Sequence, residues 1–93
     1  LLAAEQNEIS SQSITGIIFH NGDGVEQNNE EAVKWWRLAA EQGCAGAQYY
    51  LGCAYEDGDG VEQNYEKAVK WYRLAAERGD EDAKDALKRL QNE

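Results

Sequence analysis

Two acidic glycine loops are the part of the sequence that most resembles a site for chemistry. Asp57, Asp59 and Glu66 match the third, fifth and twelfth positions of a calcium-binding loop. Tyr55 stands at the first position, where calcium needs a carboxylate, and Phe19 stands there in an earlier copy of the loop. We therefore interpret the glycines as turn residues and expect no metal site.

The other reactive side chains form no recognisable catalytic or cofactor-binding motif. The Gly-x-Gly pairs lack a following Gly-Lys-Ser/Thr sequence, and their acidic neighbours would repel a phosphate. Ser10, Ser11 and Ser13 precede His20, but no strand-turn-helix elbow surrounds them. We expect no enzyme and no cofactor, and we interpret His20 as a surface residue rather than a ligand or a pH switch.

The two cysteines are too far apart to pair with each other. Cys44 and Cys53 lie on one predicted helix, where nine residues correspond to roughly 13 Å. A disulfide needs Cα atoms under about 7 Å apart. Free thiols favour a reducing compartment, while pairing between molecules stays open, so the sequence leaves the compartment unknown.

The charge balance excludes several classes of partner. Eighteen Asp and Glu against nine Lys and Arg give a net charge of −9. Such a surface repels phosphate backbones and anionic lipids, so we expect no nucleic acid as a partner. No apolar run approaches the roughly 20 residues of a membrane span, so we expect no membrane insertion. A protein or peptide with basic flanks is the partner that this charge favours.

An internal repeat sets the architecture. Residues 22–43 and 58–79 differ at only four positions and lie 36 residues apart, a period typical of all-α helix-pair solenoids. One solenoid domain over residues 1–93 is therefore expected. Because no Met begins the chain, adjacent repeats of a longer array are also expected. The expected parts are the end of a preceding repeat (1–7), a diverged repeat (8–43), a full repeat (44–79) and a terminal half-repeat helix (80–93).

Local signals place the helices within each unit. Asn28 and Asn64 can cap the second helices, and Gly52 lets a partner helix approach the first helix closely. Val25 and Val61 are expected to anchor the glycine loops in the core. Apolar residues at helical spacing predict the buried stripe of the second helices: Ala32, Trp35, Trp36, Ala39 and Ala40, with Ala68, Trp71, Tyr72, Ala75 and Ala76 in the next unit.

These motifs resemble a known family. Residues 47–52, the loop 58–61 and the run 68–76 that closes on Gly79 are similar to the Sel-one-like repeat (SLR). The resemblance implies a right-handed α/α superhelical solenoid, related to tetratricopeptide repeats and used as an adaptor or scaffold in protein complexes. It does not fix the compartment, because the family also includes secreted, periplasmic and ER-luminal proteins.

A helical wheel predicts which side chains face outward. If Leu51 faces the core, residues about 200° away on the same helix point to solvent, and the 36-residue period extends this stripe to the neighbouring units. The resemblance implies that this side lines the concave face. The predicted partner-binding residues are Ser13, Ile17, His20, Tyr49, Cys53, Glu56, Asp57, Asp85 and Arg89.

Two functions are consistent with this stripe. The first is an adaptor that binds a protein or peptide on the concave face, with Tyr49 as the apolar anchor and Glu56 as a rim charge that speeds association. The second is a structural spacer or self-assembling repeat array with no dedicated ligand. An exposed and partly apolar stripe favours the adaptor, whereas uniformly charged faces favour the spacer.

Overall fold

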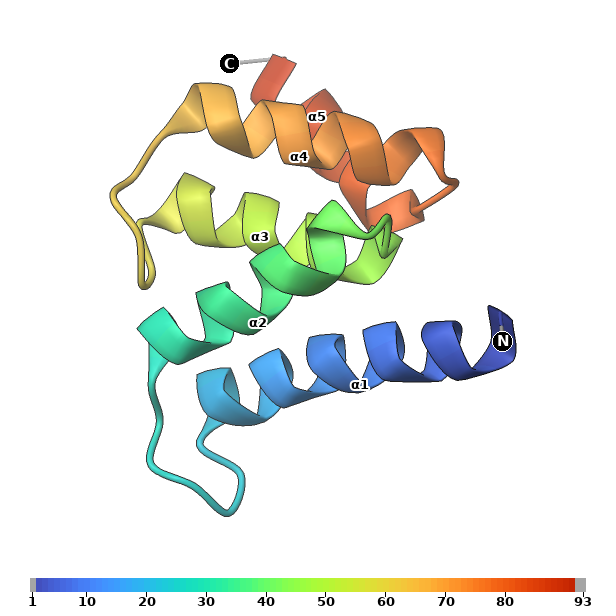
Figure 1. Cartoon of the computed structure of the whole chain (residues 1–93). Coiled ribbons are helices and arrows are strands. Elements are labelled where there is room, and N and C mark those ends of the chain that lie inside the picture. Colours follow the sequence, from blue (N-terminus) through green and yellow to red (C-terminus); the bar gives the residue numbers. More distant parts are fainter. Residues whose placement is uncertain (1, 92–93) are drawn as a thin grey trace.

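Five α-helices make up the part of the chain that the structure, a computed structural model, describes, residues 2–91 (Figure 1). Each helix packs against the next one along the chain, so the molecule is a stack of helices. This all-α arrangement is an α/α superhelix, as the sequence predicts. The helices are α1 (Leu2–Asn21), α2 (Asn29–Glu41), α3 (Ala45–Asp57), α4 (Tyr65–Glu77) and α5 (Glu81–Gln91).

Side-chain caps fix where α2 and α4 begin. The Asn28 side chain accepts a hydrogen bond from the backbone N–H of Glu31 at 3.1 Å, and Asn64 accepts one from Lys67 at 3.0 Å. Each cap satisfies a backbone donor that the first helical turn leaves unpaired. The two caps predicted from the sequence are therefore confirmed.

Two glycines let an aromatic ring lie directly on a helix backbone. A Cβ at Gly16 of α1 would lie 2.5 Å from the Trp36 indole nitrogen, and a Cβ at Gly52 of α3 would lie 2.7 Å from the Tyr72 ring. No other residue leaves room for these rings. The predicted close approach at Gly52 is confirmed, and Gly16 has the same role one unit earlier.

The core consists mainly of alanines packed around a few large side chains. Trp36 is 4% exposed, and Tyr72 and Leu51 are fully buried. The prediction that Trp35 and Trp71 are equally buried is wrong, because both are only half-buried. Each lies one position before the buried ring, so a rotation of about 100° turns it away from the first helix of its own unit.

The two glycine loops have the same sequence but different surroundings. Val61 is half-buried and packs against the core, whereas Val25 is 42% exposed, so the predicted anchoring of Val25 is wrong. A Cβ at Gly60 would lie 2.4 Å from the backbone oxygen of Asn29, but nothing described lies within 4 Å of a Cβ at Gly24. The second loop therefore rests on the start of α2, and the first loop has no such support.

The first helix is longer than the repeat pattern predicts. Residues 1–7 are expected to close a preceding repeat, yet α1 runs without a break from Leu2 to Asn21. Asn7 stands where Gly43 ends the following second helix, and Gly43 has a φ of +93° that suits glycine. Without a glycine at this point the helix continues. None of the helices in residues 2–91 is long and apolar enough to cross a bilayer.

Candidate functional site

An aromatic pocket lies where α1 ends beside α2 and α3. Its volume is about 240 Å³, and α3 supplies most of its wall. Acidic residues from the end of α3 and from the following loop complete the lining. The residues of the aromatic pocket are His20, Asn29, Trp36, Tyr49, Tyr50, Cys53, Ala54, Asp57 and Asp59.

Ring-to-ring contacts hold the wall of the aromatic pocket together. The Trp36 and Tyr50 rings stack with centroids 5.1 Å apart and an angle of 17°, and Tyr49 meets Tyr50 edge-on at 5.6 Å. His20 lies 5.6 Å from Trp36 at the other end, and Tyr49 lies 5.8 Å from the buried Tyr72. Packed rings of this kind lose little side-chain entropy on binding, so they form a preformed surface for an apolar group.

Hydrogen bonds fix the two rings that come from different helices. The Trp36 Nε1–H donates to the backbone oxygen of Ser13 at 3.2 Å, which ties α2 to α1. His20 Nδ1 lies 3.1 Å from Asn29 Oδ1. An amide oxygen only accepts, so this contact is a hydrogen bond in the tautomer whose Nδ1 carries the hydrogen. The His20 ring is therefore oriented by Asn29 at the edge of the aromatic pocket.

The electrostatics of the aromatic pocket combine a neutral floor with an acidic rim. Burial raises the pKa of the Cys53 thiol, and hydrogen bonding with Cys53 raises the pKa of Tyr49, so both groups stay neutral at physiological pH. Asp57 and Asp59 are exposed at the rim. Burial, followed by the neighbouring Glu56, raises the pKa of Asp57, as expected where carboxylates gather.

Four of the nine predicted partner-binding residues meet in this pocket. They are His20, Tyr49, Cys53 and Asp57, and they come from two helices in different repeats. Asp85 is exposed on α5 but does not line the pocket. The helical wheel thus places the centre of the stripe in the pocket, while Asp85 is exposed as predicted but lies outside it.

Ser13 and Ile17 do not face solvent as predicted. Ser13 is 7% exposed because the Trp36 indole reaches across it to its backbone oxygen. Ile17 is half-buried and packs against the core. At Ser13 the large Trp36 ring covers a small side chain, at the position where α3 carries the larger Tyr49.

Glu56 does not face solvent openly as predicted, whereas Arg89 is exposed on α5. Arg89 donates to both Glu56 oxygens, at 2.5 and 2.9 Å, and the Tyr72 hydroxyl donates to Glu56 at 2.7 Å. The Glu56 side chain is only 14% exposed. Hydrogen bonding from Arg89 lowers the pKa of the Glu56 carboxyl. Glu56 therefore joins α3, α4 and α5 and is not an open rim charge.

Several pocket residues were not predicted from the sequence. Trp36 is expected only in the core, but it also lines the pocket. On the helical wheel Tyr50 points between the predicted core face and the predicted solvent face. Its position next to Tyr49 is the one sequence feature that could have placed it in the pocket. Asn29 and Asp59 reach the pocket only because the loop after α3 folds back onto the start of α2. That placement depends on stacking between repeats.

The arrangement suits binding more than chemistry. Within residues 2–91, no three His, Cys, Asp or Glu side chains gather in a way that could hold a metal ion. The Cys53 thiol has a raised pKa, which disfavours the thiolate that nucleophilic attack requires. An aromatic floor below two carboxylates can accept an apolar group beside a cation, or a cation over a ring face.

Comparisons with solved structures place this fold among known proteins. The chain is similar to the crystal structure of a Sel1 repeat protein from Oxalobacter formigenes, with 44% identity and a TM-score of 0.88 over 91% of this chain and 35% of that one. It is 41% identical to c5321, a protective antigen of uropathogenic Escherichia coli strains with an SLR fold, with a TM-score of 0.81 over 87% of this chain and 17% of that one. Helicobacter pylori cysteine rich protein B is 28% identical, with a TM-score of 0.82 over 91% of this chain and 64% of that one.

The family assignment rests on both repeats. The part that matches this chain is about a third of the Oxalobacter protein's length. A comparison with curated proteins finds no match. Sel1 repeat proteins generally serve in protein–protein interaction. The Sel1 repeat model matches residues 9–44 and 45–80, and the chain belongs to the Sel1 repeat family.

Proposed function

We propose that this chain is a protein-interaction module that binds a peptide segment of its partner in the aromatic pocket. The observation that carries the proposal is the joining of stacked rings to an acidic rim in one preformed cavity. Aromatic anchors set in a pocket supply much of the binding free energy at protein interfaces. We expect this pocket to lie on the concave face of the longer array.

The chemistry of the pocket selects the kind of segment. An apolar side chain of the partner would pack on Tyr49 and Tyr50, and a neighbouring Lys or Arg would face Asp57 and Asp59. The net charge of −9 favours encounter with a basic segment and disfavours acidic competitors. Association is expected to slow as the salt concentration rises, because the attraction is screened.

A peptide-library selection followed by substitutions tests this proposal. We expect enrichment of peptides that combine an apolar residue with Lys or Arg. Tyr49→Ala is expected to weaken binding of a selected peptide by about 1–2 kcal/mol. Tyr65→Ala is the matched control, since Tyr65 is 56% exposed and lies outside the aromatic pocket. Calorimetric titration of both variants provides the comparison.

The charge contribution has its own matched pair. Asp59→Asn removes a rim carboxylate, whereas Asp23→Asn removes the equivalent carboxylate of the first loop, which does not line the aromatic pocket. Only the first change is expected to slow association at low salt. Enrichment of acidic peptides, or equal effects within each matched pair, would contradict the proposal and favour the structural spacer.

A further inference from the structure

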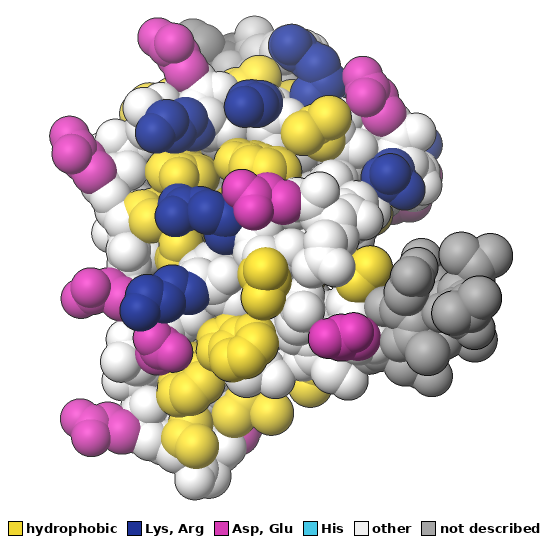
Figure 2. Space-filling view, in the orientation of Figure 1, with side chains coloured by type: hydrophobic (Ala, Val, Ile, Leu, Met, Phe, Trp, Pro, Cys, Tyr) yellow, Lys and Arg dark blue, Asp and Glu magenta, His cyan; other side chains and the backbone are white. Residues whose placement is uncertain are grey.

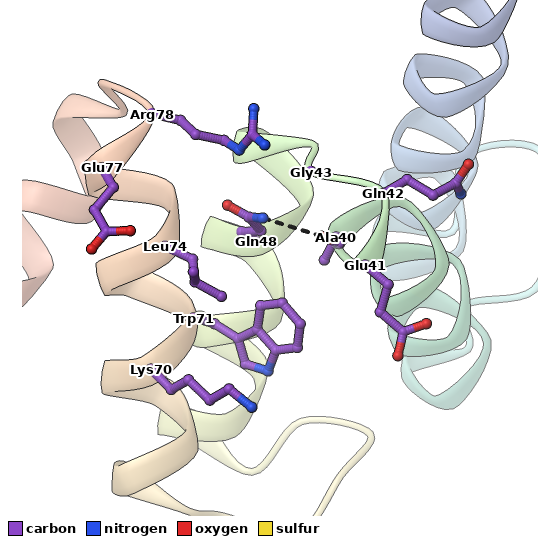
Figure 3. A pocket seen from close by; sticks show the side chains of 10 residues that line it. All are labelled: Ala40, Glu41, Gln42, Gly43, Gln48, Lys70, Trp71, Leu74, Glu77 and Arg78. Carbon is purple, nitrogen blue, oxygen red and sulfur yellow. Dashed lines mark hydrogen bonds between the residues drawn. The ribbon is translucent and has the colours of Figure 1, made fainter.

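A second hollow lies on a different face, between α2 and α4. This α2–α4 groove has a volume of about 620 Å³ and runs over α3 (Figure 3). Trp71 and Leu74 form its apolar wall on α4, and Lys70 and Arg78 lie at its two ends. Leu74 is 36% exposed, so the wall is open to solvent. None of these residues belongs to the aromatic pocket.

The floor of the α2–α4 groove holds a buried acceptor without a partner. Gln48 of α3 is 4% exposed, and its Nε2 donates to the backbone oxygen of Ala40 at 3.1 Å. This bond fixes the amide orientation, because a backbone oxygen needs a donor. The other amide atom, Oε1, has no hydrogen-bond partner within residues 2–91. A buried acceptor in this state costs free energy that a ligand with an N–H group can recover.

The preceding unit shows how the same acceptor is satisfied. Gln12 is the equivalent of Gln48, and its Oε1 accepts a hydrogen bond from Gln42 Nε2 at 2.9 Å. The equivalent of Gln42 is Arg78, one of the four differences between the repeats. The Arg78 guanidinium lies instead against the backbone of Gly43, with Nη2 2.7 Å from where a Cβ would be. This substitution leaves the second acceptor open.

The charge on this face differs from that of the whole molecule. Helices α2 and α4, with the cap residue Arg78, carry six of the nine Lys and Arg and only five of the eighteen Asp and Glu. Figure 2 shows Lys and Arg gathered over these helices among hydrophobic side chains, with acidic side chains at the margin and also beside a basic one near the centre. An acidic peptide segment of a partner, which the rest of the surface repels, can therefore approach this face.

The lining carboxylates do not close the α2–α4 groove to an acidic ligand. Glu41 and Glu77 also line it, but both are exposed, and their side chains in Figure 3 point away from Gln48. Lys70 stays close to the apolar wall, with its Nζ 5.7 Å from the centre of the Trp71 ring. A carboxylate could thus meet Arg78 or Lys70 while an apolar side chain covers the wall between them.

We infer that the α2–α4 groove is a second docking site, which binds an acidic peptide segment carrying an apolar side chain. The apolar side chain packs on Trp71 and Leu74, and a backbone N–H of the segment donates to Gln48 Oε1. A carboxylate of the segment pairs with the Arg78 guanidinium, which offers two parallel donors. The two sites of this module therefore select segments of opposite charge.

Arg78→Gln is the most informative variant, because it restores the residue found in the first repeat. The new amide is expected to donate to Gln48 Oε1, as Gln42 does to Gln12, and to remove the cation at the same time. Arg73→Gln is the matched control, since it removes one exposed cation of α4 that does not line the groove. Melting curves check that both variants stay folded.

The probe is a blocked peptide, chosen by library selection, in which an apolar residue is flanked by Asp or Glu. Arg78→Gln is expected to weaken its binding at least about tenfold, as loss of a charge-assisted hydrogen bond implies. Arg73→Gln is expected to change binding less than about twofold, and Tyr49→Ala is expected to have no effect on this peptide.

Three results would overturn the inference. The first is a selection that yields no acidic class of peptides. The second is an equal loss in Arg78→Gln and Arg73→Gln, which would indicate long-range attraction without a site. The third is concentration-dependent self-association that Arg78→Gln abolishes, measured by sedimentation, which would assign the groove to a second copy of this chain.

Discussion

The two repeats share most of their sequence and differ mainly in what surrounds them. The repeat at 44–79 lies between α2 and α5, and its loop rests on Asn29. The loop of the repeat at 8–43 has the same sequence around Gly24, but nothing described lies within 4 Å of a Cβ at Gly24. Identical residues therefore have different roles, and neighbouring repeats decide which role each has. Both binding surfaces proposed above lie where residues of the two repeats meet.

The largest expected effect concerns the ring that holds the second repeat together. Tyr72 is fully buried, lies on Gly52 and donates to Glu56. Tyr72→Ala is expected to lower the free energy of unfolding by about 3–5 kcal/mol, because it leaves a cavity. Trp71→Ala, at a half-buried position of the same helix, is expected to lower it much less. Chemical denaturation of both variants measures the difference, and equal losses would contradict the burial described here.

The glycine pair tests the role of stacking directly. Gly24 and Gly60 have φ values of +77° and +79°, so alanine carries the same backbone strain at both sites, about 1–2 kcal/mol. Only at Gly60 does the new Cβ meet the backbone of Asn29. Gly60→Ala is therefore expected to be more destabilising than Gly24→Ala by about 1–3 kcal/mol. Equal melting temperatures for the two variants would show that the loop is not packed on α2.

A smaller effect is expected at the Glu56–Arg89 pair, which has no counterpart at His20 in the first repeat. Because Arg89 lowers the pKa of Glu56 below its ordinary value of 4.5, the pair stabilises the fold at neutral pH. That contribution is lost as the pH falls through the lowered pKa. Glu56→Gln is expected to cost about 1 kcal/mol at pH 7, a modest value because Arg89 is half-exposed.

Acid titration of stability checks the sign of this effect. The difference between the wild-type protein and Glu56→Gln is expected to shrink as the pH is lowered below the ordinary pKa of 4.5 and through the lowered pKa of Glu56. A difference that persists or grows on acidification would mean that the carboxylate is not the stabilising form. Asp85→Asn serves as a control, since Asp85 is exposed on the helix that carries Arg89.

The sequence predicted the fold well because its signals are local and repeated. The 36-residue period, the Asn28 and Asn64 caps and the glycine at position 52 each depend on residues of one helix pair. They were confirmed with the all-α superhelix. Residues 1–7 were expected to end a preceding repeat, yet α1 is continuous from Leu2 to Asn21, because Asn7 stands where Gly43 ends the following second helix.

The candidate site was predicted only in part, since it depends on contacts between helices. A helical wheel assigns a face to each residue but not the size of the side chain that covers it. Ser13 is covered by Trp36. Glu56 accepts hydrogen bonds from Arg89, which lies 33 residues away along the chain. The sequence also does not predict that Gln48 Oε1 lacks a hydrogen-bond partner within residues 2–91. That depends on where the Arg78 side chain points.

The indole N–H signals of the three tryptophans provide the most direct test of the aromatic pocket. Trp36 lines the aromatic pocket, whereas Trp71 lines the α2–α4 groove and Trp35 lines neither. Addition of a selected cationic, apolar peptide to the ¹⁵N-labelled protein is expected to shift the Trp36 signal and leave those of Trp35 and Trp71 in place. A shift at Trp71 or Trp35 with an unchanged Trp36 signal would contradict binding in the aromatic pocket.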